Sequence, residues 1–230
     1  MTLDELRDAA TKEAAAHQEW PAVVRRRKLV VAIVMVAGAV LLGFSMRSKP
    51  GDESFYWLTL ALAATWLAGA FASGPLHLGS IKWHGRNQRP VITGITVGLL
   101  LGAVFLAGGL LAREIPAVAE PITRVLQFTN IGPLWIIVLI AVINGVAEEL
   151  FFRGALYTAL GHFHPVAIST LLYVICTSAS GNPMLGFAAL ILGTVCALER
   201  RATGGVLAPF LTHLVWGLIM VLALPPIFGL

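Results

Sequence analysis

The sequence Glu148-Glu149-Leu150-Phe151-Phe152-Arg153 places two carboxylates and a guanidinium inside a run that otherwise reads as a lipid-buried helix. A charged side chain at the centre of a membrane helix costs about 2.5 to 3.5 kcal/mol on insertion scales. Three such side chains in one short stretch therefore indicate a functional site. The alternative interpretation is a helix-packing ion network without chemistry.

Helical spacing gives the two carboxylates different neighbours. Arg153 follows Glu149 by four residues, so these two side chains can pair along one face. The residue four positions after Glu148 is Phe152, and Asn144 lies one turn before it. Glu148 therefore has no local cation, which suits a general base or a proton carrier.

The composition of the whole chain predicts an all-α, polytopic transmembrane helical bundle. Of 230 residues, 57% are hydrophobic and 12% are charged. The net charge of +4 comes from basic residues in short loops between apolar runs, so we interpret them as topology signals and predict no nucleic-acid partner. Cys176 and Cys196 both fall in apolar runs, which favours small buried side chains over a disulfide or a metal site.

Hydropathy predicts about seven membrane spans, at approximately 29–46, 55–73, 91–112, 133–160, 165–178, 184–198 and 205–224. Residues 113–130 are expected to form an external loop or an interfacial helix. We predict three segments: a cytosolic N-terminal segment at 1–28, two transmembrane spans with a basic loop at 29–89, and a membrane domain at 90–225.

Small residues recur every four positions in the third span, at Gly94, Gly98 and Gly102. Such a stripe lets another helix approach closely. We expect it to pack against a helix of the same chain, and homodimerisation through this face is the alternative interpretation.

Basic residues are distributed unequally between the two sides of the membrane. Eleven of the sixteen Lys and Arg residues fall in segments on the side of the N-terminus, and four fall on the other side. This asymmetry predicts a cytosolic N-terminus in an integral plasma membrane protein. The chain contains far more Arg than Lys and is rich in Ala, Gly, Leu and Val, which indicates a bacterial, high-GC origin and hence a bacterial inner membrane.

The motif of Glu148, Glu149 and Arg153, followed directly by Gly154, resembles the first signature of the CPBP (CAAX protease and bacteriocin-processing) intramembrane endopeptidases. These enzymes are relatives of the CAAX prenyl protease type 2 enzymes. The resemblance covers roughly residues 90–225, and it weakens toward the end of that range.

The later signatures of the family match only in part. The second is an aromatic residue followed four positions later by histidine, and this chain has Tyr173 and Thr177 at those positions. Asn182 and the proline after it resemble a polar turn that often follows in the family. His213 matches a catalytic or oxyanion-binding histidine, but the polar residue that commonly comes four positions later is replaced by Gly217.

The resemblance implies a role for each matching residue. Glu148 would activate water for attack on a peptide carbonyl, His213 would stabilise the developing oxyanion, and Glu149 with Arg153 would form an orienting pair. Substrate or water would contact the nearby polar residues Asn144, Tyr173, Thr177 and Asn182.

Zinc is the only cofactor that the resemblance suggests. Glu148, Glu149 and His213 could coordinate it, although the histidine missing at Thr177 removes one potential ligand.

Helix length suggests where these residues meet. At about 1.5 Å per residue, Glu148 and Thr177 lie about 18 Å from the cytosolic ends of their spans, and His213 about 12 Å. These depths predict a cavity in the inner half of the membrane that opens to the cytosol and lets water reach the site.

These observations predict an intramembrane endopeptidase that cleaves a membrane-associated peptide or protein near the cytosolic membrane face. The alternative is a catalytically impaired relative that acts as a membrane protein-binding scaffold, favoured by Thr177 and Gly217. A proton-coupled carrier that uses Glu148 is a third interpretation. The lipid bilayer is the expected environment, and a homo-oligomer is compatible with the sequence.

Overall fold

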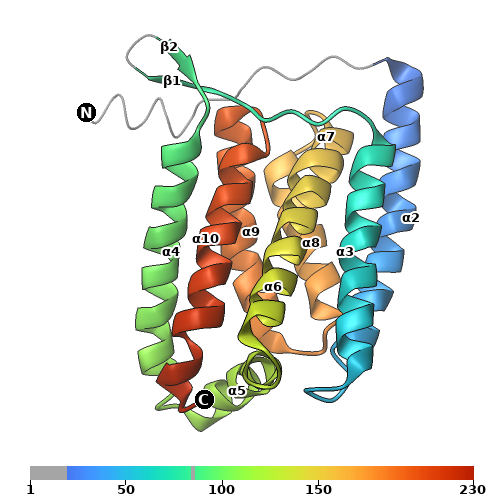
Figure 1. The fold of residues 1–230 in the computed structure, drawn as a ribbon. Coiled ribbons are helices and arrows are strands. Elements are labelled where there is room, and N and C mark those ends of the chain that lie inside the picture. The colour runs from blue at the N-terminus through green and yellow to red at the C-terminus, as the bar shows by residue number, and fades with distance from the viewer. Residues whose placement is uncertain (1–19, 84–85) are drawn as a thin grey trace.

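The structure, a computed structural model, describes residues 20–83 and 86–230. Most of the predicted N-terminal segment 1–28 therefore lies outside the described residues. The chain forms an all-α bundle of roughly antiparallel helices (Figure 1).

Long helices and short connections alternate along the chain. In order, the elements are α2 (Pro21–Ser45), α3 (Glu53–Ser73), β1 (Ile81–Trp83), β2 (Arg86–Gln88), α4 (Val91–Ala112), α5 (Pro116–Asn130), α6 (Leu134–Glu149), the π-helical η1 (Leu150–Leu156), α7 (Tyr157–Leu160), α8 (Pro165–Ser178), α9 (Pro183–Thr203), α10 (Leu207–Ala223) and the 3₁₀ helix η2 (Pro225–Phe228). The strands β1 and β2 pair antiparallel, with Ile81 opposite Gln88.

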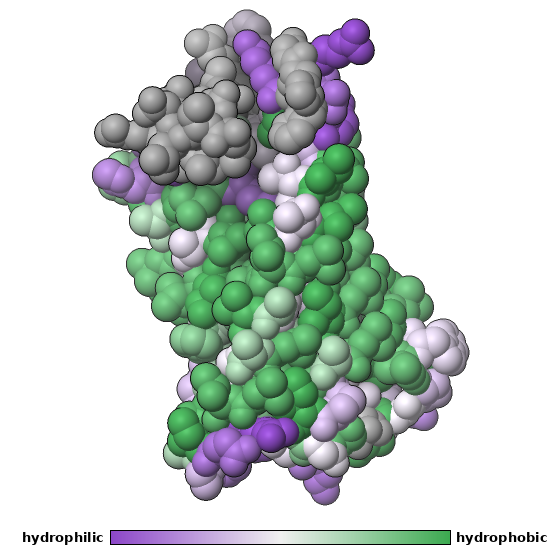
Figure 2. All heavy atoms as spheres, turned by 90° about the vertical axis from the view of Figure 1, so that its left-hand side faces the viewer, coloured by the Kyte–Doolittle hydropathy of each residue, from purple (hydrophilic) through white to green (hydrophobic). Residues whose placement is uncertain are grey.

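The bundle has the dimensions and the surface of an integral membrane protein. Among the described residues, six helices are long and apolar enough to cross a membrane, and α8 is a shorter apolar helix. Figure 2 shows a broad band of hydrophobic side chains between more polar ends. These features confirm the predicted polytopic bundle of about seven spans.

The glycine stripe of α4 packs against α10. A Cβ atom on Gly98 would lie 2.8 Å from the Cβ atom of Val215, and one on Gly94 would lie 2.6 Å from the carbonyl oxygen of Ala208. The predicted packing role is therefore confirmed. The alternative interpretation, homodimerisation through this face, is wrong, because α10 already covers the glycine stripe.

The first membrane helix begins earlier than predicted. Pro21 occupies its first turn, where a missing N–H costs nothing, so α2 starts eight residues before the expected span. Arg27, interpreted as a topology signal, is fully buried and donates hydrogen bonds to Ser73 Oγ and to the Pro75 carbonyl, both at 3.0 Å. This arginine joins α2 to the end of α3.

Two segments differ in form from simple spans. Residues 116–130 form the amphipathic helix α5, which lies at the end of the bundle where the chain also ends (Figure 1). The predicted span at 133–160 begins as α6, continues as a π-helical segment and closes with α7.

An aromatic cluster fixes the π-helical segment in the core. Phe151 and Phe152 are fully buried, and their ring centroids lie 4.6 and 5.1 Å from that of Trp66 on α3. The Phe152 ring also lies 4.7 Å from Tyr173 on α8. The segment that contains Arg153 and directly follows Glu148 and Glu149 therefore packs against both α3 and α8.

Candidate functional site

A change of helix type occurs at the acidic motif. Helix α6 ends at Glu149, and the π-helical segment that follows contains Arg153. Such segments are rare and are found frequently at functional sites. The sequence predicted a continuous helix here, because no residue type marks a π turn.

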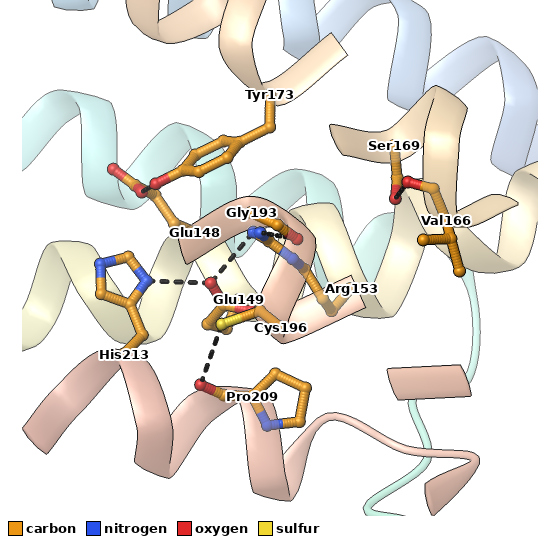
Figure 3. Close-up of polar contacts among 10 residues, drawn as sticks. All are labelled: Glu148, Glu149, Arg153, Val166, Ser169, Tyr173, Gly193, Cys196, Pro209 and His213. Carbon is orange, nitrogen blue, oxygen red and sulfur yellow. Dashed lines mark hydrogen bonds and ion pairs between the residues drawn. The ribbon is translucent and has the colours of Figure 1, made fainter. Parts of the chain in front are cut away.

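Glu149 is the centre of a buried network that uses one of its two carboxylate oxygens, while Oε2 is buried without a hydrogen-bond partner. Its Oε1 atom accepts hydrogen bonds from Arg153 Nη1 at 3.0 Å and from His213 Nδ1 at 2.9 Å (Figure 3). Arg153 also donates to the Gly193 carbonyl at 3.2 Å, and its guanidinium lies 4.6 Å from the centre of the Tyr173 ring. The predicted pair of Glu149 and Arg153 is present, and it extends to a histidine on α10.

Glu148 has a different environment. The hydroxyl of Tyr173 donates a hydrogen bond to its Oε2 atom at 2.6 Å (Figure 3). The side chain is half-buried, and in the part of the chain that the structure describes it forms no ion pair at salt-bridge distance. One carboxylate oxygen of Glu148 is therefore fixed, and the other is open to a ligand.

The contact with Glu149 determines which nitrogen of His213 is available. A carboxylate only accepts hydrogen bonds, so the Nδ1 atom of His213 carries a proton and donates to Glu149. The Nε2 atom is then the nitrogen left to act on a ligand. The imidazole lies edge-on to Trp216, which contacts Phe105 in turn, with centroid distances of 5.8 and 5.3 Å.

A cavity of about 210 Å³ lies between α6 and α10, and Glu148 and His213 are both in its wall. Asn144 and Trp216 supply further polar atoms, and most of the remaining wall is apolar, namely Ala141, Val142, Leu214, Leu218, Met220 and Val221.

The direction of this cavity differs from the prediction. Glu148 is the last of its wall residues along α6, and His213 is the first along α10. The two helices are antiparallel, so the cavity runs from Glu148 and His213 toward the end of the bundle where α6 begins. Helix α2 begins at the opposite end (Figure 1). The cavity therefore extends away from the end where α2 begins, whereas the sequence predicted an opening toward that side.

Three residues predicted to contact substrate or water do not line the cavity, namely Tyr173, Thr177 and Asn182. Tyr173 meets the cavity only through its hydrogen bond to Glu148. Asn182 caps α9 by accepting a hydrogen bond from the Met184 N–H at 2.9 Å, and it donates to the Pro121 carbonyl at 2.7 Å. Asn182 is therefore a structural joint between α9 and α5.

Asn144, predicted to contact substrate or water, lines the cavity. Its side-chain amide donates to the Ile140 carbonyl at 2.9 Å, and its Oδ1 atom is buried without a hydrogen-bond partner.

A comparison with known families covers this part of the chain. Residues 130–219 match the family model described as type II CAAX prenyl endopeptidase Rce1-like. This part of the chain is therefore similar to that family, and it is called the Rce1-like domain below. The match runs from the end of α5 into α10 and contains Glu148, Glu149, Arg153, Tyr173 and His213. The resemblance seen in the sequence is confirmed, and it supports a CAAX-protease-type intramembrane fold.

Searches of the curated proteins and of the solved structures gave no match to the chain.

The Rce1-like domain contains a second buried carboxylate that sequence reasoning missed. Glu199 on α9 is buried, and its Oε1 atom lies 2.9 Å from the hydroxyl of Thr212. That hydroxyl lies 3.0 Å from the Gly94 carbonyl, so it connects α10 to both α9 and α4. The sequence signal that could have indicated this contact is that Thr212 directly precedes His213.

Arg200 was also misinterpreted. The sequence predicted it as a basic residue at the membrane boundary, but it is buried, and its Nε atom donates to the Arg153 carbonyl at 2.8 Å. It thereby supports the π-helical segment of the Rce1-like domain.

The donor atoms of the site do not fit the zinc ion that the resemblance suggested. A catalytic zinc ion usually takes three protein ligands. Glu149 does not line the cavity, although its Oε2 atom has no hydrogen-bond partner, so Glu148 and His213 are the carboxylate and imidazole ligands that face it. Within residues 20–83 and 86–230, no group of three or more His, Cys, Asp or Glu side chains is placed to hold a metal ion.

Proposed function

We propose that the Rce1-like domain is an intramembrane endopeptidase in which Glu148 activates water. The observation that carries this proposal is the contrast between two adjacent carboxylates. Glu149 is held by Arg153 and His213, whereas Glu148 is held only by the Tyr173 hydroxyl and faces a cavity. A general base needs a positioned but available carboxylate, and Glu148 fits this requirement.

The reaction begins with a water molecule in the cavity beside Glu148. The carboxylate removes a proton from the water while the oxygen of the water forms a bond to the scissile carbonyl carbon. When the carbon–nitrogen bond breaks, the same proton passes from Glu148 to the leaving amine. Tyr173 acts as a positioning residue, because its hydrogen bond to Oε2 fixes the carboxylate during both transfers.

His213 is proposed to stabilise the charge that develops on the carbonyl oxygen. Glu149 holds the ring through Nδ1, so Nε2 is the nitrogen that can reach this oxygen. In the imidazolium form, Nε2 donates a hydrogen bond to the oxyanion. Glu149 and Arg153 act through His213 and are positioning residues.

Cleavage of membrane-tethered peptides tests this mechanism. Purified wild-type protein is compared with Glu148→Gln on a library of quenched peptides, with and without a chelator. The control is Glu120→Gln, which removes an exposed carboxylate on α5. We expect Glu148→Gln to abolish cleavage without lowering the melting temperature, and Glu120→Gln to cleave like wild type. An unchanged cleavage rate in Glu148→Gln would rule out the general base.

A membrane protein-binding scaffold is the second candidate. It is favoured by the two departures from the family pattern, because Thr177 lies outside the cavity wall and Gly217 offers no side chain. Failure of the wild-type protein to cleave any peptide in the library, together with binding of the same peptides, would support this function over the endopeptidase.

We also propose that the protein lies in a plasma membrane with its N-terminus in the cytosol. The two native cysteines are buried, so single exposed cysteines can be labelled selectively. Lys49→Cys and Ser80→Cys place a thiol at opposite ends of α3. A membrane-impermeant maleimide should label Lys49→Cys on intact cells and spare Ser80→Cys. The reverse pattern would overturn the orientation.

A further inference from the structure

We propose that the cavity between α6 and α10 binds one unprenylated aromatic or branched apolar side chain of a membrane-embedded peptide. This inference rests on the endopeptidase function proposed above, and the experiment below measures peptide binding separately from peptide cleavage. The cavity places apolar walls beside Glu148 and His213, so the bound side chain would lie next to the peptide bond that reacts.

The wall of the cavity has two chemically different parts. Glu148 and His213 occupy one end, where a peptide bond would react. Beyond them, the wall is formed mainly by aliphatic side chains of the two helices. A side chain in this part gains the transfer free energy of apolar burial, and a charged one would lose its solvation without a partner.

The volume limits the part of the occupant that the cavity can enclose. A cavity of about 150 Å³ in a protein core can hold benzene. In proportion, 210 Å³ accommodates about eight carbon atoms. A phenylalanine side chain has about seven carbon atoms and fits, whereas a farnesyl group has about fifteen and exceeds this volume. The family name mentions prenyl substrates, but this cavity is matched to an ordinary large apolar residue.

Two glycines border the cavity. A Cβ atom on Gly217 would meet no heavy atom within 4 Å, and one on Gly145 would meet only the ring of His213, at 3.4 Å. Most of the aliphatic wall residues are half-buried, so the cavity is partly open along the bundle surface. Both helices also carry exposed apolar side chains, such as Leu139 on α6 and Leu222 on α10, so the occupant is expected to come from the lipid phase.

Two unpaired polar atoms in wall residues indicate that the occupant carries a peptide group. Asn144 Oδ1 is an acceptor and Trp216 Nε1 is a donor, and both are buried without a hydrogen-bond partner. A peptide group has one N–H donor and one carbonyl acceptor, so it complements this pair once the side chains rotate slightly. An entirely aliphatic ligand would leave both atoms unpaired, which costs free energy.

Photocrosslinking of peptides to the full-length Glu148→Gln protein tests the proposal without requiring cleavage. Membrane-tethered peptides with one photoactivatable group differ at a single position, which is Ala, Leu, Phe or farnesylated Cys. We expect the Phe and Leu peptides to crosslink at least about tenfold more strongly than the farnesylated peptide, with adducts on α6 and α10.

Ala141→Leu provides a variant that narrows the cavity. It should reduce crosslinking of the Phe peptide by about tenfold and leave the Ala peptide unchanged. Leu139→Val is the matched control, because Leu139 is exposed on the same helix and lies outside the cavity wall. The peptides should crosslink to this variant in the same order of yield as to the protein without the substitution.

The outcomes separate this proposal from the endopeptidase. Equal crosslinking of the farnesylated and Phe peptides, or adducts outside α6 and α10, would overturn the cavity assignment even if the wild-type protein cleaves peptides. If the Phe and Leu peptides crosslink more strongly than the farnesylated peptide but the wild-type protein never cleaves, the cavity assignment is supported and the proposed reaction is overturned.

Discussion

The two faces of α10 meet their neighbouring helices in opposite ways. On one face, the glycine stripe of α4 lets the two helices approach until a single added Cβ atom would collide with Val215. On the other face, α6 is joined to α10 by the bond between Glu149 and His213, and a cavity of about 210 Å³ lies alongside. Glycine has a different role at each interface. Gly98 on α4 permits close contact with α10, and Gly217 on α10 leaves open space beside the cavity.

This difference shows where the bundle is built for stability and where it is built for a ligand. Close packing gains dispersion contacts, and an unfilled space forfeits them. A cavity that adjoins a buried charged network is therefore a feature that stability alone does not explain. The comparison predicts that a bulky side chain added on the α4 face impairs folding, whereas one added in the cavity impairs binding and reaction.

The largest effect is expected when Glu149, which joins α6 to α10, loses its arginine partner. Arg153→Met leaves the fully buried Glu149 without its cation and should lower the free energy of unfolding by about 3 to 5 kcal/mol. The melting temperature of the purified variant measures this loss. Arg124→Met, which removes an exposed arginine on α5, should melt like wild type. A normal melting temperature for Arg153→Met would show that Glu149 needs no such partner.

Removing the Tyr173 hydroxyl tests the positioning of Glu148. Hydrogen bonds to charged groups contribute about 1.5 to 3 kcal/mol, so Tyr173→Phe should reduce kcat for peptide cleavage by about tenfold or more. KM should stay within about twofold, because the substrate does not require this bond. Tyr56→Phe is the control, since its hydroxyl donates to the Ile131 carbonyl at 3.1 Å, outside the cavity wall. A raised KM with unchanged kcat would contradict the positioning role.

Replacing glycine by alanine should change the stability of the protein in opposite directions at the two interfaces of α10. Gly98 lies on α4 where it packs against α10, and Gly217 lies on α10 at the cavity. Gly98→Ala forces a Cβ atom to within 2.8 Å of Val215 and should destabilise the protein by about 1 to 3 kcal/mol. Gly217→Ala meets open space and should stabilise α10 by about 0.5 to 1 kcal/mol through helix propensity. Paired melting curves measure both changes. Equal destabilisation by the two variants would remove the distinction between the faces.

Features that depend on local spacing were predictable from the sequence. Hydropathy located the membrane spans, and the four-residue spacing identified the pair of Glu149 and Arg153. The four-residue repeat of Gly94, Gly98 and Gly102 likewise identified a packing face.

Features that depend on contacts between distant helices were not predictable. The sequence did not show that His213 bonds to Glu149, or that Glu199 meets Thr212. The depth estimate placed Thr177 level with Glu148, but depth gives no direction around a helix, and Thr177 lies outside the cavity wall. Depth also does not show on which side of Glu148 two helices leave space, so the direction in which the cavity extends was not predictable.

The most direct test of the account fills the cavity beside Glu148. Gly217→Leu should keep the wild-type melting temperature and reduce peptide cleavage by at least about tenfold, because its side chain is expected to occupy the space that the substrate needs. Gly108→Leu is the matched control, since a Cβ atom there also meets nothing within 4 Å but lies outside the cavity wall on α4. Cleavage by Gly217→Leu at the wild-type rate would contradict the assignment of this cavity as the reaction site.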